Sequence, residues 1–219
     1  APRDPAEPVP LEVLDATPYV ELQLHSNYSL LEGASSIDEL VTAAREQGHR
    51  ALALTDHNGL YGAMEFARAA KESGLRPIIG LELTITESTA GWDGGEDVEG
   101  DGKEGRANGA EGDSEGDGSG IRSHITLLAE TKQGYSNLCR LSSIAFGLFE
   151  QSDEAKEERR LDPCVAIEEL ERHAAGVIAL TGCRDGRIAR LVQAGRHTEA
   201  ERALSRLVDW FGPENVFVE

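Results

Sequence analysis

Short apolar segments of strand length alternate along this chain with segments of helical periodicity. The apolar segments lie at 51–55, 76–85, 123–130 and 176–182. Strands that alternate with helices pack into folds built on a mostly parallel sheet or barrel, because each helix covers a face of the sheet. The sequence therefore predicts an α/β fold.

Local signals predict where the first helices begin and end. Ser36 and Glu39 have the spacing of a capping box, and Gly48 follows the same helical pattern as its stop. A second helical pattern covers about Tyr61 to Ser73, with Gly74 as its stop. The other predicted elements are strands at 19–24 and 215–219, helices at 135–149, 165–173, 186–194 and 198–211, and a charged loop at 151–160.

Residues 86–121 differ sharply in composition from the rest of the chain. Positions 86–120 contain eleven glycines, eleven acidic residues and two basic ones. Such a segment buries too little apolar surface to offset its ordering entropy, so we expect a disordered insertion. It is either a solvated loop or a motif for a specific partner. Residues 1–18, which are acidic and rich in proline, are expected to be a flexible lead-in to a domain at 19–219.

The formal net charge of −19 argues against a nucleic-acid grip in this chain, since DNA affinity depends on Lys and Arg at the phosphates. Any DNA contact would come from another segment or partner. Three widely spaced cysteines argue against a disulfide framework and favour a reduced, cytoplasmic setting. The sequence has no apolar run long enough to cross a membrane, and its beginning does not resemble a signal peptide.

Reactive side chains gather where the predicted strands begin or end. They are His25, Asp56, His57, Glu82, His124 and Cys183. In parallel α/β folds, functional groups collect at the carboxyl ends of strands, because the loops there converge on one face. His124 is the exception, because it opens a strand. It can reach the same face if the insertion joins two antiparallel strands.

Imidazoles, carboxylates and a thiol together are the ligand chemistry of zinc and related divalent metals. Glu82 is the hardest of these residues to explain otherwise, because a buried carboxylate is costly without a partner. The others each have a simpler alternative: His25 as a hydrogen-bonded residue at a strand end, Asp56 and His57 as caps of the next helix, His124 as a surface residue, and Cys183 as a core residue.

Five segments resemble the PHP domain and occur in the order expected of that family. They are LQLHSNYSLLEGAS, ALALTDHNGLYGAMEF, PIIGLEL, HITLLAETKQGYSNLCRLSS and GVIALTGCRDG. The resemblance covers about 19–219, apart from the insertion. It is strongest to the version at the N-terminus of bacterial C-family DNA polymerases, the DNA polymerase III alpha family. LLEGAS, GLELTI and LTGCRDG resemble its error-prone branch.

The resemblance implies a distorted seven-stranded β/α barrel with a divalent metal cluster, of zinc or manganese, at its mouth. It implies that the six reactive residues above are the metal ligands. It identifies no substrate-binding residues. Gln23 stands where the family usually has histidine, and an amide is a poor substitute for imidazole on zinc. Because the chain ends at a predicted strand, we also expect that the barrel is incomplete and the sequence truncated.

The resemblance further implies the function of the parent protein, a DNA-directed DNA polymerase of damage-induced or translesion synthesis that uses magnesium. DNA and deoxynucleotides would bind through domains absent from this chain, other polymerase or translesion proteins are possible partners, and no membrane is involved. The chain itself would carry a partial phosphoesterase-type metal site. Two alternatives remain open: a free-standing PHP phosphoesterase for a small phosphomonoester, and a PHP module with a dead site that serves structure.

Overall fold

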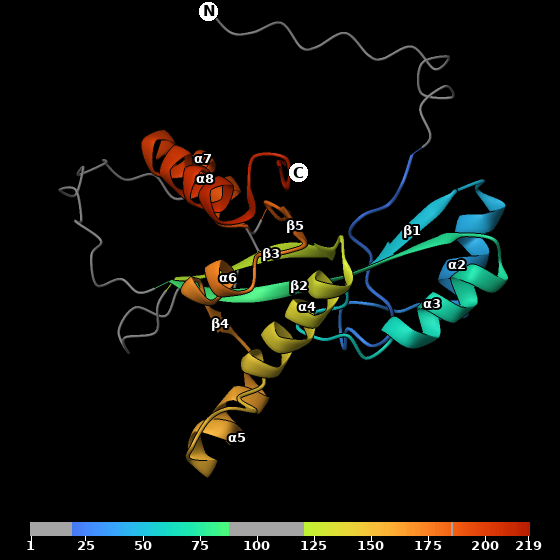
Figure 1. The fold of residues 1–219 in the computed structure, drawn as a ribbon, viewed down its shortest axis with the longest axis horizontal. Helices are drawn as coiled ribbons and strands as arrows, with labels where there is room; N and C mark the ends of the chain where they lie inside the picture. Colours follow the sequence, from blue (N-terminus) through green and yellow to red (C-terminus); the bar gives the residue numbers. More distant parts are fainter. Residues whose placement is uncertain (1–18, 88–120, 185) are drawn as a thin grey trace, which may run out of the picture.

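A computed structural model describes residues 19–87, 121–184 and 186–219, and it shows a mixed α/β fold. The strands are β1 (Ala51–Leu54), β2 (Arg76–Glu87), β3 (Ile121–Ala129), β4 (Val165–Ala166), β5 (Val177–Leu180) and β6 (Val216–Phe217). The sheet has the order β1-β2-β3-β5-β6, with β4 beside β2. The long strands β2 and β3 form its centre (Figure 1).

The sheet is mixed in direction. β2 and β3 pair antiparallel, from Gly80 opposite Leu128 to Glu87 opposite Ile121, and β3 and β5 are also antiparallel. The pairs β1–β2, β2–β4 and β5–β6 are parallel. The sheet is curled, and the fold is an incomplete β/α barrel. The described residues contribute six strands to it, so they do not complete the seven-stranded barrel that the family resemblance implies.

The helices are α2 (Ile37–Glu46), α3 (Ala63–Glu72), α4 (Lys132–Ala145), α5 (Asp153–Leu161), α6 (Glu168–Arg172), α7 (Arg187–Gln193) and α8 (His197–Phe211). The capping box at Ser36 is confirmed: its side chain accepts from the Glu39 amide, and the Glu39 carboxylate accepts from the Ser36 amide. α2 and α3 lie next to β1, whereas α7 and α8 lie at the other end of the sheet (Figure 1). No helix among the described residues is long and apolar enough to span a membrane.

The two faces of β2 have opposite characters, because successive side chains of a strand point to opposite sides. Leu81, Leu83 and Ile85 are buried in the main hydrophobic core, which also includes Leu138 and Leu141 of α4. The residues between them, Glu82 and Thr84, face the other way and are polar, yet both are buried. One face of β2 therefore packs into the hydrophobic core, and the other carries polar side chains that can form a site.

The strand predicted at 19–24 is wrong as a regular strand. Its backbone runs beside β1, and Glu21 forms a single parallel bridge with Leu52. The Ala53 amide donates to the Glu21 carbonyl at 2.9 Å. The Leu24 amide, however, donates to the hydroxyl of Thr55 rather than to a backbone carbonyl. A side chain thus takes the place of one rung of the ladder.

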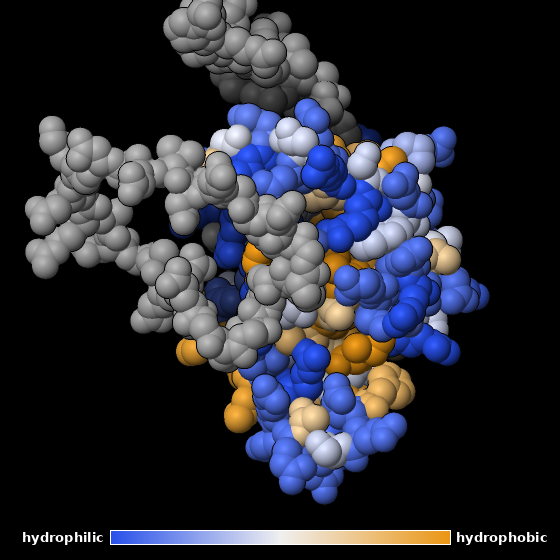
Figure 2. Space-filling model, turned by 90° about the vertical axis from the view of Figure 1, so that its left-hand side faces the viewer, coloured by the Kyte–Doolittle hydropathy of each residue, from blue (hydrophilic) through white to orange (hydrophobic). Residues whose placement is uncertain are grey.

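The loop predicted at 151–160 is also wrong, because Asp153–Leu161 forms helix α5. The Ser152 hydroxyl accepts from the Ala155 amide as an N-cap, acidic residues occupy the first turn and arginines the last, which complements the helix dipole. No residue of α5 is buried. The helix projects from the rest of the molecule and its surface is mainly hydrophilic (Figures 1 and 2). The prediction of a loop rested on the high charge of this segment and overlooked the N-cap at Ser152.

Other predicted boundaries move by smaller amounts. Thr86, Glu87 and Ile121, which the sequence placed in the insertion, belong to the β2–β3 pair. Positions 88–120 and 1–18 lie outside the described residues, so the predicted insertion and lead-in stay predictions. The helix predicted at 165–173 is split, because its first two residues form β4.

Candidate metal centre

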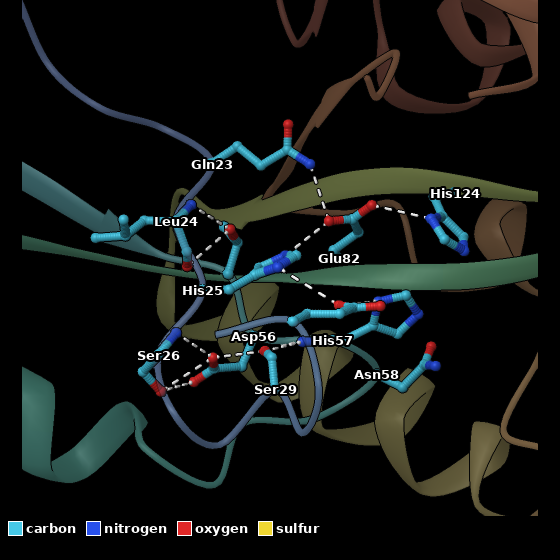
Figure 3. Close-up of polar contacts among 12 residues, drawn as sticks. Gln23, Leu24, His25, Ser26, Ser29, Asp56, His57, Asn58, Glu82 and His124 are labelled. Carbon is cyan, nitrogen blue, oxygen red and sulfur yellow. Dashed lines mark hydrogen bonds and ion pairs between the residues drawn. The ribbon is translucent and has the colours of Figure 1, made fainter. Parts of the chain in front are cut away.

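The carboxylate of Glu82 is the centre of the polar face of the sheet. Its side chain lies on β2 and is 3% exposed. Oε2 accepts from Gln23 Nε2 at 2.9 Å and lies 2.7 Å from His25 Nε2, while Oε1 lies 3.1 Å from His124 Nδ1. Figure 3 shows these three side chains converging on Glu82 from two sides. The sequence argument that Glu82 needs a partner is confirmed.

This environment keeps Glu82 ionised. Burial on its own raises the pKa of the carboxyl group, but the hydrogen bonds from His124, His25 and Gln23 outweigh it, so that the pKa lies well below its ordinary value. The hydrogen bond to Glu82 in turn raises the pKa of His25, against the opposing effect of burial. A buried carboxylate flanked by imidazoles offers the negative charge and the donor atoms that bind a divalent cation.

Three residues bring ligand atoms close enough to hold one ion. His57, Glu82 and His124 each offer an atom, and these atoms lie within 4.8 Å of one another. We call this set the ligand trio. Its geometry comes from backbone pairing, because His57 bridges to Glu82 and Thr84 lies opposite His124 in the antiparallel β2–β3 pair. The expected antiparallel connection is thus confirmed, and it is what brings His124 to the site.

The ring of His57 is oriented through both of its nitrogens. Nδ1 lies 3.1 Å from Glu32 Oε2, and Nε2 lies 2.9 Å from the hydroxyl of Thr84. Asn58 Nδ2 donates to the same hydroxyl, so Thr84 can donate its own proton to His57 Nε2. We infer that Nδ1 carries the ring proton and that Nε2 accepts from Thr84. A carboxylate behind a histidine in this way is the usual support of a metal-ligating imidazole.

Asp56 points away from the trio. Its carboxylate is buried and accepts from the amide and hydroxyl of Ser26 and from the hydroxyl of Ser29 at 2.7 Å. In Figure 3 it faces the loop that follows His25, on the side opposite to His57. The alternative that Asp56 caps the next helix is wrong, because Gly62 occupies the N-cap of α3. A ligand role for Asp56 stays a prediction.

His25 and Cys183 also lie outside the trio among the described residues. His25 reaches the site through its contact with Glu82. Cys183 follows β5, and its carbonyl accepts from the amide of Gly186, which pairs with His124 in a parallel bridge. The loop that carries the thiol is therefore beside the backbone of His124. The roles of His25 and Cys183 as ligands stay predictions.

Sequence reasoning missed two side chains that shape the site. Glu32 Oε2 lies within hydrogen-bonding distance of His57 and 3.5 Å from His25 Nδ1. Thr84, two positions after Glu82 on the same face of β2, contacts His57. The alternation of the strand was a signal that could have found Thr84. Glu32 is positioned by a loop, for which the sequence offers no periodicity.

The loop at 26–33 has one position that only glycine can occupy without adjustment. A Cβ at Gly33 would lie 1.9 Å from the carbonyl oxygen of Ser26. The Gly33 amide donates to the carbonyl of Ser29, which closes the turn. This close approach folds the loop back on itself and brings Glu32 to the histidines. The close backbone contact at Gly33 thus helps to position the Glu32 carboxylate beside the histidines.

A model of the family described as "PHP domain" matches residues 21–219 of the chain. The chain is 36% identical over 214 residues to the error-prone DNA polymerase of Symbiobacterium thermophilum, an alignment that covers 92% of this chain and 16% of that protein. It is 34% identical over 203 residues to DNA polymerase III subunit alpha of Treponema pallidum, covering 92% and 15%. The chain thus spans about a sixth of the length of these curated relatives.

Among solved structures, a Bifidobacterium adolescentis protein proposed to be a metal-dependent phosphoesterase matches with a TM-score of 0.36 and 17% identity, over 86% of this chain and 55% of the other. This similarity is too low for a comparison of the two sites.

Proposed function

The chain belongs to the PHP domain family, and we propose that it is the N-terminal PHP portion of an error-prone DNA polymerase of the DNA polymerase III alpha type. Two relatives that carry those names support this proposal. Because the chain spans about a sixth of their length, deoxynucleotide addition would belong to other parts of the protein. Those parts would bind DNA, deoxynucleotides and magnesium, in replication or in translesion synthesis after DNA damage.

For the chain itself, we propose a divalent metal site of the phosphoesterase type, which takes zinc or manganese. The observation that carries this proposal is the ligand trio, whose imidazole and carboxylate atoms lie within 4.8 Å of one another. The donors fit such an ion, since zinc binds imidazole and carboxylate groups and manganese accepts both. When bound, the metal supplies a water of lowered pKa and neutralises charge on phosphoryl oxygens.

The residues of the chain have separate duties in this site. Glu82 supplies the buried negative charge, and Gln23 and His25 hold its carboxylate in place. His57 supplies a ring nitrogen, and Glu32 and Thr84 hold the ring through Nδ1 and Nε2. Besides the ligand role that the family resemblance implies, Asp56 fixes the loop that follows His25 and carries Glu32, because it accepts hydrogen bonds from Ser26 and Ser29.

Metal content tests this proposal directly. The purified chain, dialysed against Zn²⁺ or Mn²⁺ and then against buffer, is expected to retain close to one ion. His57→Ala removes a trio member and is expected to lower affinity at least tenfold, because outer contacts alone are worth 10- to 100-fold. His173→Ala is the matched control, since this half-buried histidine bonds to the Glu169 carbonyl away from the site. Equal metal retention by both variants would refute the site.

Gln23 favours a second candidate, a PHP module whose site serves structure. The amide of Gln23 donates to the Glu82 oxygen that also contacts His25, and it offers no strong zinc ligand itself. In that case Zn²⁺ would raise the melting temperature of the chain without any hydrolysis of bis(p-nitrophenyl) phosphate. Hydrolysis that is lost with a chelator and with His57→Ala, but kept in His173→Ala, would instead support the phosphoesterase site.

A further inference from the structure

Asn58 is a buried residue beside the site, and the proposed function gives it no role. It follows His57 directly, is 6% exposed and has a φ of 55°, a conformation that asparagine adopts more readily than most residues. Figure 3 shows its side chain next to that of His57. Each hydrogen-bonding group of Asn58 has a partner in another part of the fold, so its position is fixed from several sides.

Backbone groups of the fold fix the orientation of the Asn58 side chain. The Asn58 amide donates to the carbonyl of Glu82 at 2.7 Å, and its carbonyl accepts from the hydroxyl of Ser142 on α4 at 2.9 Å. In the side chain, Oδ1 accepts from the amide of Thr84 at 2.8 Å, and Nδ2 donates to the carbonyl of Pro163 at 3.3 Å. A backbone amide only donates and a carbonyl only accepts, so Oδ1 and Nδ2 cannot exchange places.

This orientation decides where the hydroxyl of Thr84 sends its proton. Asn58 Nδ2 donates to Thr84 Oγ1 at 3.0 Å, and His57 Nε2 lies 2.9 Å from the same oxygen. The hydroxyl has a single proton, and His57 Nε2 is the acceptor within reach of it among the described residues. A proton on Nε2 would leave this buried hydroxyl without an acceptor there, which is unfavourable. We call these three groups the hydroxyl relay.

We propose that Asn58 is a positioning residue, which keeps the ring proton of His57 on Nδ1 by means of the hydroxyl relay. Glu32 acts on the same ring from the other side, through its contact with Nδ1, but its side chain is 46% exposed. The role rests on the proposed metal site, because an imidazole binds a metal only through an unprotonated nitrogen. The hydrogen bonds of the relay, however, form without any ion.

Replacing Asn58 by aspartate should reverse the relay with little change of shape. A carboxylate cannot donate, so the Thr84 hydroxyl would turn toward it and His57 Nε2 would have to donate to Thr84 Oγ1. This holds whether the ring stays neutral or gains a second proton. Long-range ¹H–¹⁵N correlation spectra of the full chain, in chelator at alkaline pH, distinguish protonated from unprotonated ring nitrogens. We expect Asn58→Asp to shift Nε2 of His57 to the protonated position, with the signal identified by its loss in His57→Gln.

Two further variants show whether the effect passes through Thr84. Thr84→Val in the Asn58→Asp background keeps the added charge but removes the hydroxyl, so Nε2 should return to the unprotonated position. Asn137→Asp is the matched control, because Asn137 is 5% exposed and bonds to the carbonyl of Ala175 instead of to the relay. It should not move the signal. An Nε2 that is unmoved in Asn58→Asp, or that stays protonated without the Thr84 hydroxyl, would overturn the proposal.

A second pair of variants tests the relay without a buried charge, so the test does not depend on the folding of Asn58→Asp. Glu32→Ala removes the carboxylate at Nδ1 and should still show one form, with the proton on Nδ1, because Asn58 holds the Thr84 hydroxyl. Adding Asn58→Gly, which suits the positive φ, releases the hydroxyl and should give a mixture of both tautomers. A mixture already present in Glu32→Ala, or a single form in the double variant, would contradict the relay.

Retention of Zn²⁺, measured on the same proteins after removal of the chelator, separates the two levels of inference. A wild-type chain that retains no ion, together with the expected Nε2 shift in Asn58→Asp, would refute the metal site and support the role of Asn58. A wild-type chain that retains the ion, together with an unmoved Nε2 in Asn58→Asp, would refute the role of Asn58 and leave the metal site standing.

Discussion

Replacing Glu82 by glutamine removes the buried charge of the site and changes little of its volume. In the metal-free chain, the carboxylate contacts Gln23, His25 and His124, and all of these contacts lie on the polar face of the sheet. Breaking a buried ion pair costs roughly 3–5 kcal/mol, and the partial exposure of both histidines lowers this figure. We expect Glu82→Gln to lower the free energy of unfolding by about 3 kcal/mol near pH 6.

The cost should depend on pH in a defined way. The pKa of His25 is raised from its ordinary value of 6.5, so its contribution is complete below pH 6.5 and is lost as the pH rises through the folded pKa. The pKa of Glu82 is lowered from 4.5, so its contribution is complete above pH 4.5 and is lost as the pH falls. The loss should be greatest between these values and should fall to about 1 kcal/mol at pH 9.

Urea unfolding in the presence of a chelator measures this difference at each pH. Glu32→Gln is the matched control, because its side chain is 46% exposed and faces the same histidines. It should cost at most about 1 kcal/mol. A Glu82→Gln cost that is equal at pH 6 and pH 9, or equal to the cost of Glu32→Gln, would refute the assignment of a buried charge stabilised by His25.

Three further changes test other parts of the site. Gln23→His places an imidazole beside Glu82 and should raise Zn²⁺ affinity in competition dialysis; an unchanged affinity would show that position 23 is not a ligand position. Asp56→Ala removes the acceptor of the Ser26 amide and hydroxyl and should lower the urea-unfolding free energy by roughly 2–4 kcal/mol, whereas a loss below 1 kcal/mol would contradict its anchoring role. Gly33→Ala should cost more than about 1 kcal/mol, since its Cβ would lie 1.9 Å from the Ser26 carbonyl oxygen; wild-type stability in the same assay would show that the loop can move.

Local sequence patterns were sufficient where a single element decides the outcome. The capping box at Ser36 predicted the start of α2, and strand periodicity placed Glu82 in an apolar strand where it needs a partner. The position of His57 after a buried strand predicted its approach to Glu82. These features depend on neighbours in the chain or on the alternation of a strand, both of which can be seen in the sequence.

Directions of side chains in loops could not be predicted in this way. Asp56 and His57 are adjacent, yet one turns to Ser26 and Ser29 and the other to Thr84, because each finds its hydrogen-bond partners across the fold. The family resemblance implies that Asp56 and His57 are both metal ligands, whereas in the structure they contact different partners. Helix α5 was missed for a related reason, since it buries no residue and so leaves no hydrophobic pattern to detect.

By itself, the sequence determined the α/β class, the family and most of the residues that meet at the site. Only the tertiary structure decided which of them share Glu82, that Glu32 stands behind His57, and that Asn58 holds the hydroxyl of Thr84 beside the same ring. The physical reason is that strand periodicity and helix caps are local, whereas the contacts of a buried carboxylate depend on whatever the sheet and its loops bring within about 3 Å.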